Sequence, residues 1–350
     1  MPSRTRYTLS RRDWLAAAAL GAALPAARAQ AVPIKFQLDW RFEGNAALFT
    51  VPAARGYFKD EKLDVAVDAG NGSAAAIARV ASGAYDIASA DMAALMEFYG
   101  NNPDTPNKPV AVMMIYSNTP AAVMMLKKSG IRKPTDLAGK NLGAPIFDGG
   151  RKAWPIFAQA NRIGPVTWTS MDPPLRETML VRGDVDAITG YAFTSLLNLE
   201  SRGVKAQDVT VMAYKDYGVK QYGNAVIVSP QFLDRHPEAV KGFLRAFARG
   251  VKELMANPKA AIETVKARDG IINPALEERR LAMVLDMAVL TADARAEGFG
   301  AVDEARLRLM ASQLSDTYKT KVRVDAAKLW NASFLPSAEE RDIFKSLKKK

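Results

Sequence analysis

The sequence predicts an α/β protein with two lobes and a helical C-terminal third, and three observations lead to this fold class. Short apolar strands alternate with helices from residue 34 to residue 229, which is typical of α/β sheets. About 320 residues follow an N-terminal segment of the export type, which is more than one hydrophobic core usually holds. Beyond residue 229, apolar side chains recur at helical spacing.

The first unit is predicted from hydrophobic periodicity and from the Gly and Pro residues that interrupt it. Its predicted strands are 34–38, 63–67, 86–90 and 110–116, and two of its predicted helices are 74–82 and 92–99. A further helix is expected around Pro52, and it should begin near Val51 or bend there because proline is tolerated only in a first turn. The alternation of strands and helices implies a parallel sheet.

A second unit of the same kind begins near Ala121. Its predicted strands are 122–126, 141–145, 186–189 and 209–213, and its predicted helices are 134–140, 152–162 and 175–182. A strand at 225–229 then leads into the helical third. Three apolar stripes there are assigned to the core: Val240, Phe243, Leu244, Phe247, Val251 and Leu254; Leu281, Val284, Leu285, Ala288 and Val289; and Leu307, Met310 and Leu314.

The first 31 residues have the layout of an export signal. The pair Arg11 and Arg12 directly precedes an apolar run, Trp14–Leu24, which is too short to span a bilayer. Small residues at 27–31 then suit a signal peptidase. We predict export to the periplasm with removal of residues 1–31; the twin-arginine route is favoured, and general secretion stays open.

The residue inventory excludes several kinds of catalytic site. The chain has no Cys and one His, so it has no disulfide, no thiol nucleophile and no thiolate metal site. The single histidine, His236, lies at a predicted helix start, where capping or surface roles are more usual, and no Gly-x-Ser-x-Gly motif is present. We predict no catalytic residue, metal or cofactor, while a carboxylate pair of the glycosidase kind stays open.

The net charge of +11 does not indicate a nucleic-acid partner. Residues 1–31 carry five Arg and one Asp, which leaves +7 for the rest of the chain. Part of this charge lies in Lys348–Lys350, a run typical of a solvated tail, and other basic residues are mixed with acids, as in Glu277–Arg280. No basic face interleaved with aromatic residues is present.

Two glycine-rich turns open predicted helices. Gly70–Ala75 fits a relaxed dinucleotide-binding pattern, with Asp91 about 20 residues onward, and this interpretation stays open as a minor alternative. A simpler role is favoured, in which the turn presents N–H groups and the positive end of a helix dipole to a polar ligand. Phe147–Gly150 offers a second such turn, although both turns could need glycine for backbone geometry alone.

Several motifs together resemble the periplasmic substrate-binding proteins of ABC importers, in the group for nitrate, sulfonates, taurine and thiamine-pyrimidine precursors (the thiamine pyrimidine synthase-like family). The resemblance covers about residues 34–265. The motifs that carry it are Leu38–Trp40, Gly56–Val65, Gly70–Ser73, Ala81–Ala88, Gly130–Lys140, Gly183–Ala187 and Phe232–Glu238. It implies a type II periplasmic binding protein, with two α/β lobes joined by two hinge strands near residues 115–120 and 217–225.

In the domain division that follows, residues 32–117 and 222–350 form lobe I with the C-terminal helices, and residues 118–221 form lobe II. The resemblance implies capture of a small-molecule ligand by a monomer and docking to an ABC permease in the inner membrane. The Leu-Asp-Trp motif resembles the thiamine-pyrimidine branch, in which a flat N-heterocycle is held between aromatic side chains. Eukaryotic enzymes of this superfamily use their own histidine, a cysteine-rich motif and a pyridoxal cofactor; because this chain lacks Cys, an enzyme is not expected.

The chemistry of the residues agrees with such a ligand. Three aromatic side chains follow predicted strands and could stack on a ring, and three aspartates could accept hydrogen bonds from ring amino groups. The predicted ligand-binding residues are Asp39, Trp40, Asn45, Gly72, Ser73, Asp91, Phe147, Asp148, Gly149, Tyr191 and Asn224. Two alternatives stay open: a sulfonate, taurine, nitrate or other small anion bound at the two helix starts, and a periplasmic enzyme or signalling module on the same scaffold.

Overall fold

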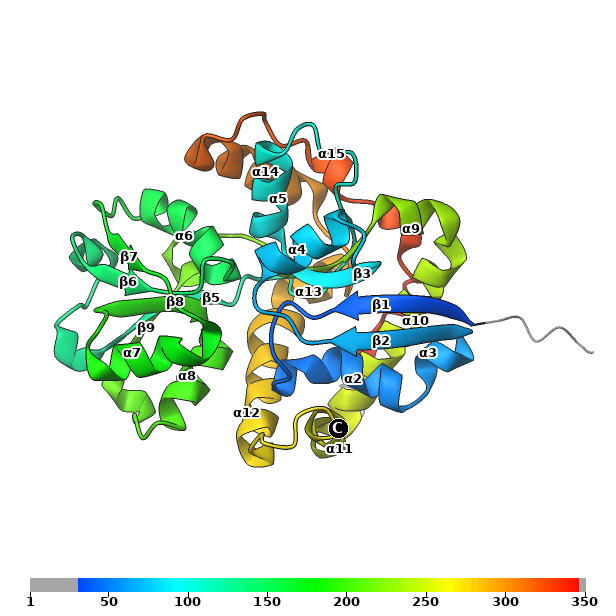
Figure 1. Ribbon diagram of the computed structural model, residues 1–350, viewed down its shortest axis with the longest axis horizontal. Coiled ribbons are helices and arrows are strands. Elements are labelled where there is room, and N and C mark those ends of the chain that lie inside the picture. The colour runs from blue at the N-terminus through cyan, green and yellow to red at the C-terminus, as the bar shows by residue number, and fades with distance from the viewer. Residues whose placement is uncertain (1–30, 346–350) are drawn as a thin grey trace, which may run out of the picture.

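The computed structural model describes residues 31–345, which form two α/β lobes side by side (Figure 1). We propose the division made from the sequence and use its names, lobe I for 32–117 with 222–350 and lobe II for 118–221. The predicted export signal and the lysine tail lie outside the described residues. Each lobe contains a five-stranded sheet, and after the last strand of the chain, Asn224–Val228, the remaining regular elements are helices. The predicted fold class, two α/β lobes with a helical C-terminal third, is confirmed. Within residues 31–345, every helix is too short or too polar to cross a membrane.

The sheet of lobe I has the strand order β2-β1-β3-β10-β4. Its strands are β1 (Val32–Gln37), β2 (Leu63–Asp68), β3 (Ile87–Asp91), β4 (Val110–Met114) and β10 (Asn224–Val228). Strand β1 pairs in parallel with β2 and β3, whereas β10 runs antiparallel to β3 and β4.

The sheet of lobe II repeats this plan with the order β7-β6-β8-β5-β9. Its strands are β5 (Ala121–Leu126), β6 (Asn141–Gly143), β7 (Thr167–Thr169), β8 (Ala187–Tyr191) and β9 (Val209–Ala213). Strand β5 is antiparallel to β8 and β9. The parallel sheet predicted for the first unit is therefore wrong, because both sheets are mixed: β5 and β10 each enter from the other lobe and run antiparallel to their neighbours.

The chain passes between the two sheets twice, through residues 115–120 and 218–223. These two segments are hydrogen-bonded to each other: the Gly223 amide donates to the Tyr116 carbonyl at 2.9 Å, and the Thr119 amide donates to the Gln221 carbonyl at 2.9 Å. The crossing is thus formed by two segments that are hydrogen-bonded to each other.

Helices cover both sheets and form the last third of the chain (Figure 1). In lobe I they are α2 (Ala47–Ala54), α3 (Tyr57–Asp60), α4 (Ser73–Ala81), α5 (Met92–Asn101), α9 (Pro230–Arg235), α10 (Pro237–Ala256), α11 (Pro258–Lys266), α12 (Pro274–Val284), α13 (Ala292–Glu297), α14 (Glu304–Tyr318) and α15 (Ala326–Leu329). In lobe II they are α6 (Gly149–Ala160), α7 (Arg176–Arg182) and α8 (Ala192–Glu200). A π-helical turn, Leu285–Val289, extends α12.

Two helices differ from their predicted bounds near a proline. Helix α2 begins at Ala47 and runs through Pro52, because that proline packs directly on Gly250 of α10. Helix α6 begins at Gly149 instead of residue 152 because the Asp148 side chain caps it, and Pro155 lies in its interior. Proline disfavours a helix interior, but packing against α10 outweighs this preference in α2, and the Asp148 cap outweighs it in α6.

The apolar stripe predicted on α10 is buried against β1, α2 and α3. Phe36 and Phe58 stack on Phe243, and Phe49 stacks on Phe247. A second core cluster continues from α4 and α5 of lobe I to α6 of lobe II, so the two lobes share buried apolar contacts. This packing fixes the elements that carry the candidate site.

We predict that Gly250→Ala destabilises the protein by about 1–2 kcal/mol, because the added methyl group would overpack the contact with α2 while the gain in helix propensity offsets part of the cost. A Cβ atom at Gly250 would lie 2.6 Å from Pro52 Cδ. Denaturant unfolding measures the change. Gly270→Ala is the control because no atom lies within 4 Å of its added Cβ; equal stability of the two variants would contradict this packing.

Candidate ligand-binding site

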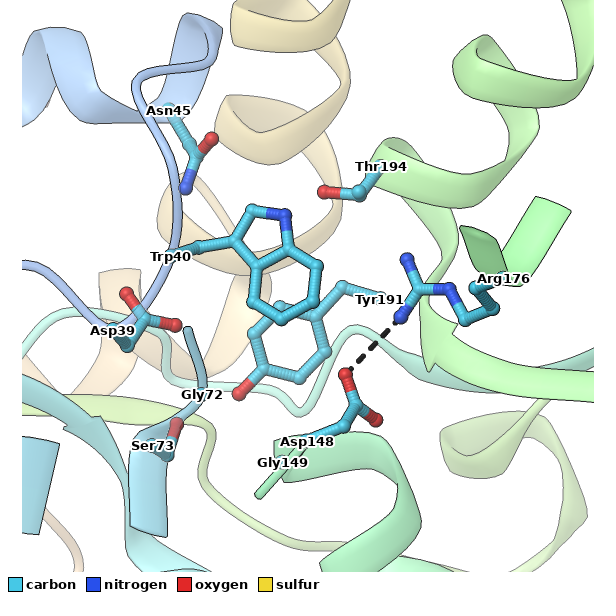
Figure 2. A pocket seen from close by; sticks show the side chains of 10 residues that line it. All are labelled: Asp39, Trp40, Asn45, Gly72, Ser73, Asp148, Gly149, Arg176, Tyr191 and Thr194. Atoms are coloured by element: carbon cyan, nitrogen blue, oxygen red, sulfur yellow. Dashed lines mark hydrogen bonds and ion pairs between the residues drawn. The ribbon is translucent and has the colours of Figure 1, made fainter. Parts of the chain in front are cut away.

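The two lobes enclose a small cavity beyond the carboxyl ends of β1, β3 and β8, where ligands bind in open α/β sheets (Figure 2). Its free volume is about 10 Å³, enough for roughly one water molecule. Ten residues line it: Asp39, Trp40, Asn45, Gly72 and Ser73 from lobe I, and Asp148, Gly149, Arg176, Tyr191 and Thr194 from lobe II. The structure is therefore a closed form.

Eight of the eleven predicted residues lie on this wall: Asp39, Trp40, Asn45, Gly72, Ser73, Asp148, Gly149 and Tyr191. Asp91 and Asn224 lie next to it and contact the Tyr191 hydroxyl. Phe147 does not line the cavity. Phe147 is 45% exposed and lines a separate groove with Ile146 and Leu175, so its position does not support stacking on a ligand.

Sequence reasoning missed two wall residues, Arg176 and Thr194. Arg176 begins α7, and its side chain is buried; an arginine in a first helical turn usually indicates solvent exposure. Thr194 lies on α8, a helix that was not predicted. The strand-helix alternation carried a usable signal for α8, because a connection from β8 at residue 191 to β9 at residue 209 has room for a helix.

Trp40 is held in place by the glycine-rich turn that follows β2. The Gly70 amide donates to the Trp40 carbonyl at 2.9 Å, and the Gly72 amide donates to the Asp39 carbonyl at 2.7 Å. A Cβ atom on Gly70 would lie 1.9 Å from the Leu38 carbonyl oxygen, so only glycine permits this approach. The Leu-Asp-Trp and Gly-Asn-Gly motifs therefore form one structural unit.

Because the amides of this glycine-rich turn donate to carbonyl groups of the protein, few of them are free to bind an anion. The Ala74 amide at the start of α4 donates across the lobes to the Phe147 carbonyl at 3.4 Å. With Gly70, Gly72 and Ala74 all bonded to carbonyl groups, the turn does not present the open row of N–H groups that a pyrophosphate needs. The geometry disfavours the dinucleotide alternative.

The indole of Trp40 lies in the middle of the site, between Asn45 and Asp39 of lobe I and the side chains of Arg176 and Thr194 (Figure 2). Trp40 is 8% exposed, and its Nε1 atom is buried without a hydrogen-bond partner. The Arg176 guanidinium lies 5.3 Å from the centroid of the indole ring. The indole thus offers a ring face and an unused N–H donor.

Asp39 and Asp91 are both buried carboxylates with raised pKa values. The Ser89 hydroxyl donates to Asp39 at 3.3 Å, and burial raises the pKa of Asp39 to about 6. Burial raises the pKa of Asp91 to about 7, although its hydrogen bonds to the Tyr191 hydroxyl and to two amides of α5 oppose the rise. Burial disfavours the charged form because water no longer solvates it.

Tyr191 joins the lobes at this point. Its hydroxyl lies 3.0 Å from Asp91 Oδ2 and 2.6 Å from Asn224 Oδ1. A hydroxyl carries one proton, so it donates to one of these oxygen atoms at a time. Asn224 in turn donates to the Ser89 hydroxyl at 3.1 Å, which links the chain of hydrogen bonds back to Asp39.

Asp148 occupies the N-terminus of α6. Its Oδ1 atom accepts from the Arg151 amide at 2.9 Å, and its Oδ2 atom lies 3.2 Å from Arg176 Nη1. Burial raises the pKa of Asp148, and the charge of Arg176 opposes this rise. Arg176 also donates through Nε to Glu177 at 2.9 Å. The positive end of the α6 dipole is therefore already matched by a carboxylate of the protein.

A buried arginine of lobe I connects the lobes beside the cavity. Arg280 of α12 donates to the carbonyl groups of Phe193 and Thr194 at 3.0 and 2.9 Å, and to Asn198 Oδ1 at 2.9 Å, all in lobe II. Within lobe I it pairs with Glu277 at 2.7 Å. These bonds form only when the lobes are together, so they stabilise the closed form directly.

Metal ligation is not favoured by this arrangement. Among residues 31–345, no three His, Asp or Glu side chains are grouped so as to hold a metal ion. The single histidine, His236, lies between α9 and α10 and packs on Phe232. The cavity wall provides an aromatic ring face, two carboxylates, one guanidinium and neutral hydrogen-bonding groups.

A family model described as NMT1/THI5 like matches residues 44–261, which is more than half of the chain. The chain belongs to this family. Among its relatives, a riboflavin-binding protein of Chloroflexus aurantiacus is 27% identical over 70% of this chain and 70% of its own. A formylaminopyrimidine-binding protein of Halalkalibacterium halodurans is 24% identical over 72% of this chain and 77% of its own.

A third relative of this NMT1/THI5 like chain carries an enzyme name. It is a 4-amino-5-hydroxymethyl-2-methylpyrimidine phosphate synthase of Legionella pneumophila, 27% identical over 41% of this chain and 46% of its own.

Solved structures show the same fold. An alkanesulfonate-binding protein of Xanthomonas axonopodis bound to MOPS superposes with a TM-score of 0.68, at 12% identity, over 87% of this chain and 100% of that chain. A periplasmic nitrate-binding protein of Synechocystis has a TM-score of 0.61, at 12% identity, over 92% of this chain and 90% of that chain.

We predict that Asp91→Asn makes stability less dependent on pH. The folded pKa of about 7 is above the unfolded value of 3.8, so the folded state holds this proton more tightly, and stability falls as the pH rises from about 4 to about 7. Asparagine cannot ionise and still caps α5. At pH 8 the variant should gain roughly 2–4 kcal/mol, a few degrees in thermal unfolding.

The same comparison at pH 4 should show little difference between the two proteins, because Asp91 is then protonated in the folded wild type. Asp172→Asn, at an exposed position, serves as the control for loss of one carboxylate. If stability depends on pH in Asp91→Asn just as it does in the wild type, the raised pKa of Asp91 is not the cause of that dependence, and the prediction is contradicted.

We predict that Asn198→Ala weakens ligand retention about tenfold, because it removes a buried, charge-assisted hydrogen bond between the lobes and leaves both carboxylate partners of Arg280 in place. The loss should appear as faster dissociation, with little change in association. Glu200→Ala is the matched control, since it removes an exposed ion pair between the lobes, with Arg279, and such pairs contribute little. Stopped-flow displacement distinguishes the two variants; equal dissociation rates would contradict the role of Arg280.

Proposed function

We propose that this protein is the solute-binding component of an ABC import system and that it closes two lobes around a small, flat N-heterocycle resembling a thiamine-pyrimidine precursor. One observation carries the proposal: the buried indole of Trp40, with an unpartnered Nε1 atom, lies in a cavity formed by both lobes. Asp39 lies on the same wall and Asp91 beside it, where carboxylates accept hydrogen bonds from ring amino groups. Two relatives named for riboflavin and formylaminopyrimidine, both flat nitrogen heterocycles, support this ligand class.

Binding requires the lobes to separate. A cavity of about 10 Å³ holds roughly one water molecule, so a ring enters only when Trp40 and Arg176 move apart. The paired segments 115–120 and 218–223 are the only covalent links between the sheets of the described chain, and we propose that they act as the hinge. Closure then excludes water and strengthens every polar contact with the ligand.

A small anion is the second candidate, favoured by the fold of the sulfonate- and nitrate-binding proteins. The site chemistry argues against it. The start of α6 already carries Asp148, and the turn before α4 has its amides bonded to carbonyl groups. Asp39 would also face the anion, and Asp91 lies just behind the wall, while Arg176 is already paired to Asp148 and Glu177.

We propose a binding protein without enzymatic activity. The synthase relative shows that the family includes a protein with an enzyme name. Here the cavity wall contains no cysteine and no histidine, since the chain lacks Cys and its only His packs on Phe232. Turnover of a bound heterocycle would be the finding that reverses this proposal.

Its cellular context follows from the same proposal. We propose export to the periplasm through the signal at residues 1–31, capture of a small molecule by a monomer, and delivery to a permease in the inner membrane. The basic residues outside the signal are not arranged as a nucleic-acid-binding face. A metal ion or organic cofactor has no assigned part in this cycle.

We predict that Trp40→Ala and Asp39→Ala each weaken binding of a flat heterocycle at least tenfold without unfolding the protein. Thermal shift of residues 32–350 against aminopyrimidines, purines, flavins, taurine, alkanesulfonates and nitrate identifies the ligand class, since saturation stabilises by roughly 2.7 kcal/mol at 100 times Kd. Phe147→Ala, outside the cavity, is the control and should bind normally. A shift with sulfonates or nitrate alone would overturn the heterocycle, and unchanged affinity in both variants would overturn the site.

A further inference from the structure

The buried charges of the protein are unevenly matched. Among residues 31–345, the buried charged side chains are six carboxylates and two arginines: Asp39, Glu43, Asp91, Asp148, Glu177, Glu277, Arg176 and Arg280. All of them lie on the cavity wall or are connected to it through one or two hydrogen bonds or ion pairs. Charges taken out of water need partners of opposite sign or several hydrogen bonds.

Four of the six carboxylates have arginine partners. Asp148 lies 3.2 Å and Glu177 2.9 Å from the guanidinium of Arg176. Glu277 lies 2.7 Å and Glu43 3.4 Å from that of Arg280. Glu43 also pairs with the half-exposed Arg41 at 2.7 Å. Each of these four carboxylates therefore has a positively charged partner within the protein.

Asp39 and Asp91 have only neutral partners. Asp39 contacts the Ser89 hydroxyl, and Asp91 contacts the Tyr191 hydroxyl and two helix amides. No Lys, Arg or His of the described chain forms an ion pair with either of them. Their raised pKa values agree with this geometry, since burial without a cation is the main cause. Asp39 lies on the cavity wall, so a bound molecule can reach it.

The aromatic wall already accommodates a cation. Arg176 places a planar, positively charged guanidinium 5.3 Å from the Trp40 ring centroid. Indole is the aromatic side chain that attracts cations most strongly. The cavity that Trp40 and Asp39 both line therefore combines a cation-attracting ring face with a carboxylate that has no positive partner (Figure 2).

We propose that the ligand carries a positive charge: a cationic, amino-substituted nitrogen heterocycle whose ring packs on Trp40 and whose charge pairs with Asp39. This inference rests on the proposed function and narrows it from flat heterocycles in general to those that are positively charged when bound. Asp91 contributes from behind, through Tyr191 and Asn224, by keeping the potential at that end of the cavity negative. Arg176 and its two carboxylates stay paired on the lobe II side.

The test compares two rings of nearly equal shape, 4-amino-1-methylpyridinium, a permanent cation, and 4-methylaniline, which is neutral. Isothermal titration calorimetry at pH 8 and 150 mM salt measures both against wild-type protein and against Asp39→Asn, an isosteric variant without the charge. We expect the cation to bind wild type at least about tenfold more tightly and this preference to fall below about threefold in Asp39→Asn. Asp172→Asn, which removes an exposed carboxylate, should keep the wild-type preference.

Each outcome decides a different statement. Equal or tighter binding of the neutral ring overturns the cationic ligand while leaving the heterocycle-binding function intact. A preference for the cation that persists in Asp39→Asn overturns the role of Asp39. If neither ring binds and only sulfonates or nitrate stabilise the protein, both this inference and the proposed function fail. Circular dichroism of the variants shows that they are folded.

Discussion

The closed arrangement of the lobes depends on buried polar contacts between them, above all those of Arg280. Its guanidinium has carbonyl and amide partners in lobe II and carboxylate partners in lobe I, and a buried arginine deprived of either set would be costly. Apolar contacts alone would let two surfaces slide, whereas these bonds have defined directions. They set the position of α8, and hence Thr194, relative to the loop that carries Trp40 and Asn45. The Gly44 amide donates to Glu277 at 2.5 Å and ties that same loop to the Arg280 network.

Much of the fold and part of the site were predictable because their signals are local. Strand periodicity predicted β1, β2 and β3. For the Gly-Asn-Gly turn, the sequence favoured N–H groups presented to a ligand and left open a need for glycine in the backbone alone. The structure agrees with the second interpretation, since Gly72 has a φ of +140° and the Gly70 and Gly72 amides donate to carbonyl groups. The rule that sites form at the carboxyl ends of strands then brought Asp39, Trp40 and Tyr191 together. The stripe on α10 was predicted for the same reason, since helical spacing identifies a buried face without knowledge of its partner.

The rest depended on contacts between distant segments. Glu277–Arg280 resembles a solvated charge run, yet Glu277 and Arg280 lie three residues apart on one buried face while Arg279 is exposed. Arg176 is buried because Asp148, 28 residues earlier, pairs with it across the second lobe. The direction of β5 and β10 follows from the double crossing between lobes, which no local pattern records. Phe147 was placed in the site by its neighbours in sequence, but its carbonyl faces Gly72 and its ring faces solvent.

The distribution of charge bears on how selectivity would arise. The chain is basic overall, at +11, while the buried surface between its lobes carries more carboxylates than arginines. At physiological salt the field of exposed charges is screened within about 8–10 Å, so the basic exterior neither attracts nor repels a small solute strongly at a distance. Discrimination would then take place after entry, where low dielectric amplifies local charge. A solute whose charge complements these carboxylates would keep the lobes closed for longer than one whose charge does not. Related complexes usually differ more in their dissociation rates than in their association rates.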